Sequence, residues 1–126
     1  MYRSVALISP QSNFSLDALE RAFRDRLEGL QMVRSGTRFK ISVDRWEMTL
    51  TMYNAPEVLE ESGEIARRYA AKRADRDVIA SCERRLEIQG GADPHMDHCN
   101  DYILAVECLE AFKGVFVFDP HSREWI

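Results

Sequence analysis

The clearest pattern in the chain lies between residues 30 and 53, where apolar and polar side chains alternate. The alternation runs through residues 38–43 and again through residues 46–53, and a period of two is typical of strands with one buried face. Two turn-forming pairs, Ser35-Gly36 and Asp44-Arg45, separate the alternating runs. The segment therefore predicts an antiparallel meander of three strands with one apolar face and one polar face.

Two-residue turns at these places also predict which residues face each other across the strands. The second turn sets Val43 opposite Trp46 and Phe39 opposite Leu50. The first turn sets Met32 opposite Phe39. Every predicted pair places apolar side chains on the same face, so the two turns and the hydrophobic pattern agree with each other.

Apolar runs near both ends of the chain predict two further strands. Residues 5–8 and 115–118 are apolar at successive positions, which is typical of strands that are covered on both faces. We therefore expect both strands to be central in the sheet. A turn at residues 119–122 is expected to lead into a short edge strand at residues 124–126.

Helical spacing of apolar side chains, preceded by capping residues, predicts four helices. One lies before the meander, and three follow it. The residues expected to cap them are Ser15, Asn54, Asp75 and Asp93, the last followed by Pro94. The third helix is expected to continue to Leu86. The same spacing predicts that Leu59 on the second helix and Ile103 on the fourth are buried.

The predicted element order is β-α-β-β-β-α-α-α-β. This order gives an α+β fold in which a mostly antiparallel sheet of about five strands packs against helices. No repeat, linker or low-complexity tract interrupts the chain, so residues 1–126 are expected to form a single α+β domain.

Composition narrows the classes of partner. The chain has 45% apolar and 30% charged residues, an ordinary globular balance, and its net charge of -4 argues against a broad surface for nucleic acid. The three cysteines are expected to be free thiols in a reducing compartment. No apolar run reaches the roughly 18–20 residues of a membrane helix, and residues 5–8 are too few for a signal peptide. We therefore expect a cytoplasmic protein with no membrane or nucleic-acid partner.

One group of side chains could support metal or thiol chemistry. If the fourth helix starts at Asp93, then His95, His98 and Cys99 share one surface, and they are ligand types that zinc prefers. Cys99 is also a candidate nucleophile, because the helix dipole favours its thiolate. However, no Cys-x-x-Cys or His-Glu-x-x-His spacing is present, and free cysteines are commonly inert core residues. The common nucleotide-binding glycine motifs are also missing from the sequence, so no cofactor is expected.

The polar face of the meander is the main candidate for a partner surface. It is expected to present Arg38, Lys40, Glu47, Thr49, Thr51 and Tyr53. Tyrosine and arginine are enriched at protein interfaces, which favours a contact surface, whereas a plain solvated sheet face is the alternative.

The sequence by itself does not determine the function. In size, charge and element order the chain resembles small acidic bacterial proteins of two-layer α+β type, including some immunity proteins that block toxins. The favoured hypothesis is a non-enzymatic protein-binding module of the immunity or adaptor kind, which binds a protein partner or forms a homodimer. The alternative is a small metal-dependent or thiol enzyme that uses His95, His98 and Cys99.

Overall fold

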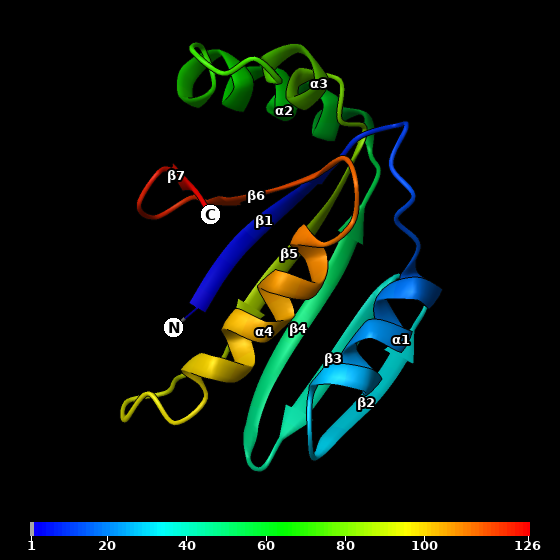
Figure 1. Ribbon diagram of the computed structural model, residues 1–126, viewed down its shortest axis with the longest axis vertical. Helices are drawn as coiled ribbons and strands as arrows, with labels where there is room; N and C mark the ends of the chain where they lie inside the picture. The colour runs from blue at the N-terminus through cyan, green and yellow to red at the C-terminus, as the bar shows by residue number, and fades with distance from the viewer. Residues whose placement is uncertain (1) are drawn as a thin grey trace.

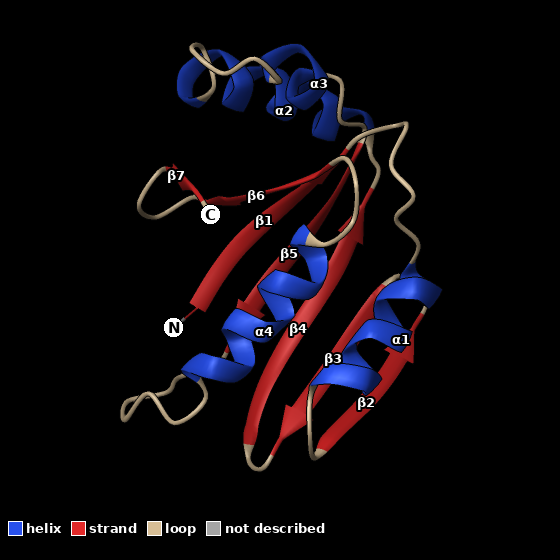
Figure 2. Ribbon diagram, in the orientation of Figure 1, coloured by secondary structure: helices blue, strands red, loops and turns tan. Residues whose placement is uncertain are grey.

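Seven strands form one antiparallel sheet in the computed structural model, which describes residues 2–126 (Figure 1 and Figure 2). The strands are β1 (Tyr2–Ile8), β2 (Leu30–Ser35), β3 (Arg38–Val43), β4 (Trp46–Tyr53), β5 (Arg84–Gly90), β6 (Val115–Asp119) and β7 (Glu124–Trp125). The helices are α1 (Leu16–Arg26), α2 (Pro56–Tyr69), α3 (Arg76–Ala80) and α4 (Cys99–Glu110). The strand order is β2-β3-β4-β5-β1-β6-β7, so the α+β class is confirmed, with seven strands rather than about five.

The turn between β3 and β4 has the predicted register. Val43 lies opposite Trp46 and Phe39 lies opposite Leu50, and all four side chains are buried. The turn begins with Asp44 at a φ of 55°, a left-handed conformation that aspartate tolerates better than most residues. The meander therefore forms without a glycine at this turn.

The turn between β2 and β3 lies one residue later than predicted. Gly36 and Thr37 occupy it, and Gly36 has a φ of 59°, which favours glycine. Met32 consequently faces Ile41 instead of Phe39, so the predicted pairing was wrong by two residues. Because side chains alternate with a period of two, the shift leaves the same residues on the apolar face.

The largest correction concerns β5. The sequence predicts a third helix from Asp75 to Leu86, but α3 ends at Ala80 and residues 84–90 form a strand instead. β5 pairs with β4 on one side and with β1 on the other. Leu86 and Ile88 alternate with polar residues and are fully buried, so pairing on both sides outweighs the helical spacing that precedes them.

Two helices cover one face of the sheet along most of its length. Figure 2 shows α1 over the meander and α4 over the centre of the sheet. The main core lies beneath them and includes Phe23, Phe39 and Leu109. α1 begins at the predicted cap, because the Ser15 hydroxyl accepts a hydrogen bond from the backbone N–H of Ala18 at 3.1 Å.

The opposite face is covered only at one end, where α2 and α3 lie (Figure 1). A smaller cluster there contains Val5 and Leu7 of β1 with Ala66, Ile79 and Cys82. β1 therefore contacts apolar groups on both faces, as predicted for a central strand. The rest of this face carries no helix.

The helices differ from the sequence predictions at several positions. α2 is one continuous helix whose N-cap is Ala55, with no side-chain hydrogen bond, so Asn54 is not its cap. Pro56 takes the first helical position, where its missing N–H has no cost. Leu59 and Ile103 are each 44% exposed, because the buried sides of α2 and α4 are formed by neighbouring positions instead.

Within residues 2–126, no helix combines the length and the apolar character required to cross a membrane.

Gly90 at the end of β5 gives a direct test of this packing. A Cβ atom there would lie 2.7 Å from Cζ2 of Trp46 and 3.1 Å from the ring of Tyr2, whereas one at Gly63 in α2 would meet nothing within 4 Å. We expect Gly90→Ala to lower the free energy of unfolding by about 1–3 kcal/mol through overpacking. Gly63→Ala should raise it by about 0.5–1 kcal/mol, because alanine favours the helix. Urea denaturation of both variants measures this, and a Gly90→Ala protein at least as stable as wild type would contradict the packing described.

Candidate functional site

The uncovered part of the second sheet face, here called the open face, carries the residues predicted from the meander. Arg38, Lys40, Glu47 and Tyr53 are exposed, and Thr49 and Thr51 are half-buried. Register accounts for this arrangement, since Arg38 pairs with Thr51 and Lys40 pairs with Thr49 while their neighbours face the core. The structure therefore brings all six predicted residues together on one surface.

β5 and β1 extend this surface with residues that the sequence reading missed. Thr51 lies beside Glu87, and Thr49 lies beside Gln89, which in turn lies beside Arg3 of β1. Arg85 follows on the same face, next to Tyr53. The alternation of polar and apolar residues from 84 to 90 was the signal that could have identified this segment as a strand, but its place between β4 and β1 depends on partners distant in the sequence.

A cleft of about 340 Å³ lies where α2 meets the open face. Its apolar side chains come from β1, α2, β6 and the turn after β6, and they are Val5, Ile65, Tyr69, Phe118 and Pro120. Its charged side chains are Arg3, Arg68, Arg85, Arg123, Glu61, Glu64 and Glu87. A second hollow of about 200 Å³ is lined by Arg38, Thr49, Thr51, Tyr53, Glu87 and Gln89. Since Glu87 lines both, the two hollows adjoin across the open face.

Arg85 connects α2 to the sheet at the boundary of the two hollows. Its guanidinium pairs with Glu61 of α2 and, at 3.2 Å, with Glu87 of β5, and the side chain is only 17% exposed. It also lies over the ring of Tyr53, 5.9 Å from the centroid. Two carboxylates of the cleft are thereby held by one arginine, which fixes the wall of the cleft.

The remaining arginines of the cleft differ in their partners. Arg68 pairs with Glu64 at 3.1 Å. Arg3 and Arg123 form no ion pair with any group in residues 2–126, and both are exposed. Four arginines against three glutamates give the cleft a positive balance, although the chain as a whole carries -4.

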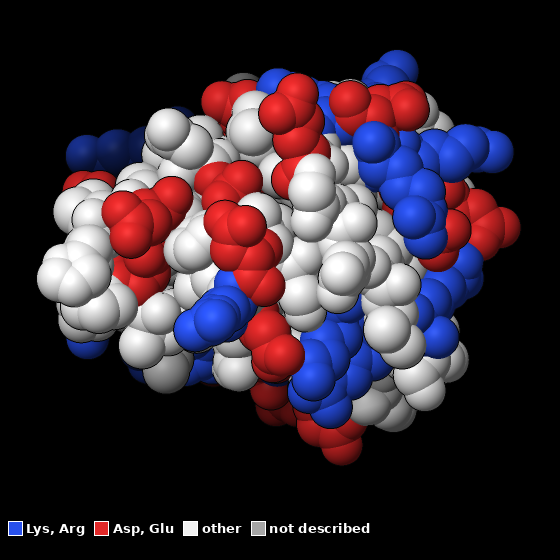
Figure 3. Space-filling view, turned by 90° about the horizontal axis from the view of Figure 1, so that it is seen from below, with Lys and Arg blue, Asp and Glu red and all other residues white. Residues whose placement is uncertain are grey.

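Basic side chains are unevenly distributed elsewhere as well. In the view from below, many of the lysines and arginines gather on the side where Figure 1 places α1, β2 and β3 (Figure 3). Acidic side chains are scattered across that view among uncharged residues. The chain is mildly acidic overall, but basic side chains gather locally. The side on which they gather includes β3, the strand that carries Arg38 and Lys40.

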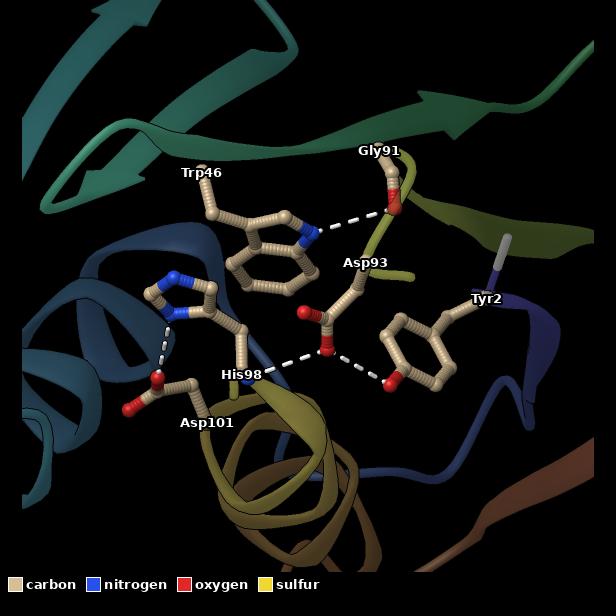
Figure 4. Close-up of polar contacts among 6 residues, drawn as sticks. All are labelled: Tyr2, Trp46, Gly91, Asp93, His98 and Asp101. Atoms are coloured by element: carbon tan, nitrogen blue, oxygen red, sulfur yellow. Dashed lines mark hydrogen bonds and ion pairs between the residues drawn. The ribbon is translucent and has the colours of Figure 1, made fainter. Parts of the chain in front are cut away.

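The His/Cys segment forms a structural network before α4 instead of a helical surface. α4 begins at Cys99, not near Asp93, and His95 is exposed outside the helix. Asp93 accepts hydrogen bonds from the Tyr2 hydroxyl at 2.8 Å and from the backbone N–H of His98 at 3.0 Å, as Figure 4 shows. Asp93 thus links β1 to the start of α4. It lies five residues before the position from which a helix is usually capped.

The ring of His98 makes two contacts within the protein. It stacks on Trp46 with the planes 3° apart and the centroids at 5.2 Å, and its Nδ1 lies 3.0 Å from Asp101 (Figure 4). The Trp46 indole donates a hydrogen bond to the carbonyl of Gly91 at 3.1 Å. These contacts orient His98 as part of the packing between β4 and α4.

The predicted metal set does not converge. Among residues 2–126, no group of three or more His, Cys, Asp or Glu side chains is arranged to hold a metal ion, and this includes His95, His98 and Cys99. Cys82 and Cys108 are buried, and burial raises the pKa of both thiols, that of Cys82 to about 12. These two thiols are poor nucleophiles at neutral pH, because the thiolate is the reactive form.

Comparison with protein-family models, with curated proteins and with solved structures found no match to this chain.

The Asp93 network predicts a specific dependence of stability on pH. Burial alone would raise the pKa of Asp93, but the hydrogen bonds from Tyr2 and from backbone N–H groups outweigh it and lower the pKa. A carboxyl group with a lowered pKa stabilises the folded state above its unfolded pKa of about 3.9, and this contribution is lost as the pH falls through the folded pKa. The Tyr2 hydroxyl, held by Asp93, has a raised pKa and stays a neutral donor throughout this range.

Asp93→Asn keeps an oxygen that can accept both hydrogen bonds but cannot ionise. Its melting temperature should therefore fall less between pH 7 and acid pH than that of wild type. Asp97→Asn is the matched control, since Asp97 is exposed and should leave the wild-type slope unchanged. Thermal denaturation between pH 7 and acid pH measures these melting temperatures. If the melting temperatures of wild type and Asp93→Asn depended equally on pH, the role given to Asp93 would be ruled out.

Proposed function

We propose that this protein is a non-catalytic binding module that contacts a protein partner through the open face and its cleft. The observation that carries this proposal is the continuity of the surface. Two adjoining hollows run from Arg38 across β4, β5 and β1 to Arg123, on a face that α2 covers only at one end.

The chemistry of the surface supports a protein partner. Its side chains combine threonine, tyrosine and arginine with a partly apolar cleft, a mixture favoured at protein interfaces. Arg85 and Tyr53 are held in place before any partner arrives. A preordered contact surface loses less side-chain entropy on binding than a mobile one.

The form of binding that fits best is that of an immunity or adaptor protein of bacterial type. Such a protein acts by occupying a surface of its partner, and it needs a rigid scaffold with an exposed patch. A sheet face bordered by α2 at one end supplies such a scaffold, because side chains on strands are positioned by the register of their neighbours. A homodimer through the same face is the second form of this proposal.

Thr51 and Tyr53 line the hollow that adjoins the cleft, and they give the test. We expect Thr51→Ala/Tyr53→Ala to weaken association with the partner, or self-association, by at least about tenfold, as truncation of central contacts does. The control is Glu110→Ala/Lys113→Ala, because Glu110 ends α4 on the opposite side of the sheet and both residues are exposed.

Association is measured by capture from native lysate, followed by size-exclusion chromatography with light scattering, after each variant is shown to melt like wild type. The proposal requires a complex that wild type and the control retain and that Thr51→Ala/Tyr53→Ala loses. A wild-type protein that remains a lone monomer would refute it, and so would a complex that all three proteins form equally.

A further inference from the structure

We infer that the segment of the partner that enters the cleft is acidic and carries an apolar side chain. This inference rests on the proposed function and adds the chemistry of the occupant. The carboxylates of the segment would pair with Arg3 and Arg123, while its apolar side chain would lie on the floor formed by Val5 and Phe118.

The floor of the cleft explains why an apolar group is needed. Val5 and Phe118 are 6% and 3% exposed, so their accessible edges lie at the bottom of the cleft. Ile65 and Tyr69 of α2 form the adjoining wall. A volume of about 340 Å³ lies at the lower end of the range of ligand pockets, roughly 300–1,000 Å³, and suits one large side chain better than an extended ligand.

The ion pairs within the cleft indicate which sign of charge its occupant should carry. All three glutamates of the cleft already have an arginine partner, since Glu61 and Glu87 pair with Arg85, and Glu64 pairs with Arg68. Among the charged groups that line the cleft, Arg3 and Arg123 are those without an ion-pair partner in residues 2–126. An acidic group can therefore bind without displacing an internal ion pair, whereas a basic group would have to compete with one.

Arg123 is held at the edge of the cleft by a fixed turn. The Asp119 carboxylate accepts hydrogen bonds from the backbone N–H groups of His121 and Ser122, at 2.8 and 3.2 Å. The N–H of Arg123 donates to the carbonyl of Asp119 at 2.8 Å, and Arg123 has a φ of 63°. Arg3 lies on the central strand β1, so both cations are attached to ordered backbone.

The same charges favour a carboxylate over a phosphate chain. A guanidinium can bind either group through two parallel hydrogen bonds. However, three glutamates line the cleft, and they would repel a chain of phosphates much more strongly than one or two carboxylates. An acidic peptide segment thus fits both the two unpaired arginines and the acidic surroundings.

Nuclear magnetic resonance of the nitrogen-15-labelled chain of 126 residues tests this inference. The probe is the peptide Glu-Phe-Glu with both termini blocked, and the comparison peptides, blocked in the same way, are Lys-Phe-Lys and Glu-Gly-Glu. We expect the probe to shift the amide signals of Val5, Phe118 and Arg123, and both comparison peptides to bind at least about tenfold more weakly. Binding should weaken further between about 0.05 M and about 0.5 M salt, because exposed charges are screened.

Two double variants complete the experiment. Arg3→Gln/Arg123→Gln should weaken binding of the probe at least about tenfold. Arg21→Gln/Arg45→Gln removes two exposed arginines of α1 and the β3–β4 turn and should leave binding unchanged. No shift at the cleft, equal binding of the lysine peptide, or an equal effect of both double variants would overturn the inference.

The two proposals can fail separately. If a partner is captured and lost on Thr51→Ala/Tyr53→Ala while the acidic peptide leaves the cleft signals unmoved, only the acidic occupant is refuted. If the peptide binds as expected but no partner or dimer forms, the proposed function is refuted and the cleft remains a site for acidic groups.

Discussion

The pairing of β5 with both β4 and β1 is the constraint on which the rest of the structure depends. It joins the meander to the N-terminal strand and makes one sheet from segments distant in sequence. On the covered face it buries Leu86 and Ile88 beneath the helices. On the open face it places Glu87 between the two hollows, and it gives Arg85 its position against α2.

The two faces of the sheet consequently have different roles. One face is covered by α1 and α4 and contributes most of the buried apolar surface. The Asp93 network fixes the start of α4 on this face. The other is covered by α2 and α3 at one end only, so that the cleft forms at the edge of the cover. The binding role that we propose for the open face rests on what this face exposes, whereas the covered face maintains the fold.

Local patterns predicted the parts of the fold that local forces decide. The alternation around Phe39 and Leu50 determined one hairpin register, and Ser15 identified the start of α1. Residues 84–90 were misread because a strand paired on both sides depends on partners far away in the chain, which helical spacing around Ile79 does not reveal. For the same reason, half of the candidate surface was predicted from the meander, while Arg3, Arg85 and the cleft required the tertiary structure.

Cross-strand proton contacts measured by nuclear magnetic resonance test the central position of β5 most directly. In an antiparallel sheet, a residue of a central strand forms a hydrogen-bonded pair with one neighbour, with Cα atoms about 5.5 Å apart, and a non-hydrogen-bonded pair with the other, at about 4.5 Å. Cross-strand contacts are therefore expected between amide protons on the first side and between Hα protons on the second. The structure predicts such contacts from Glu87 to Thr51 on one side and from Glu87 to Val5 on the other. Contacts between residues three apart along 84–90, with neither cross-strand signal, would show a helix there and contradict the whole arrangement.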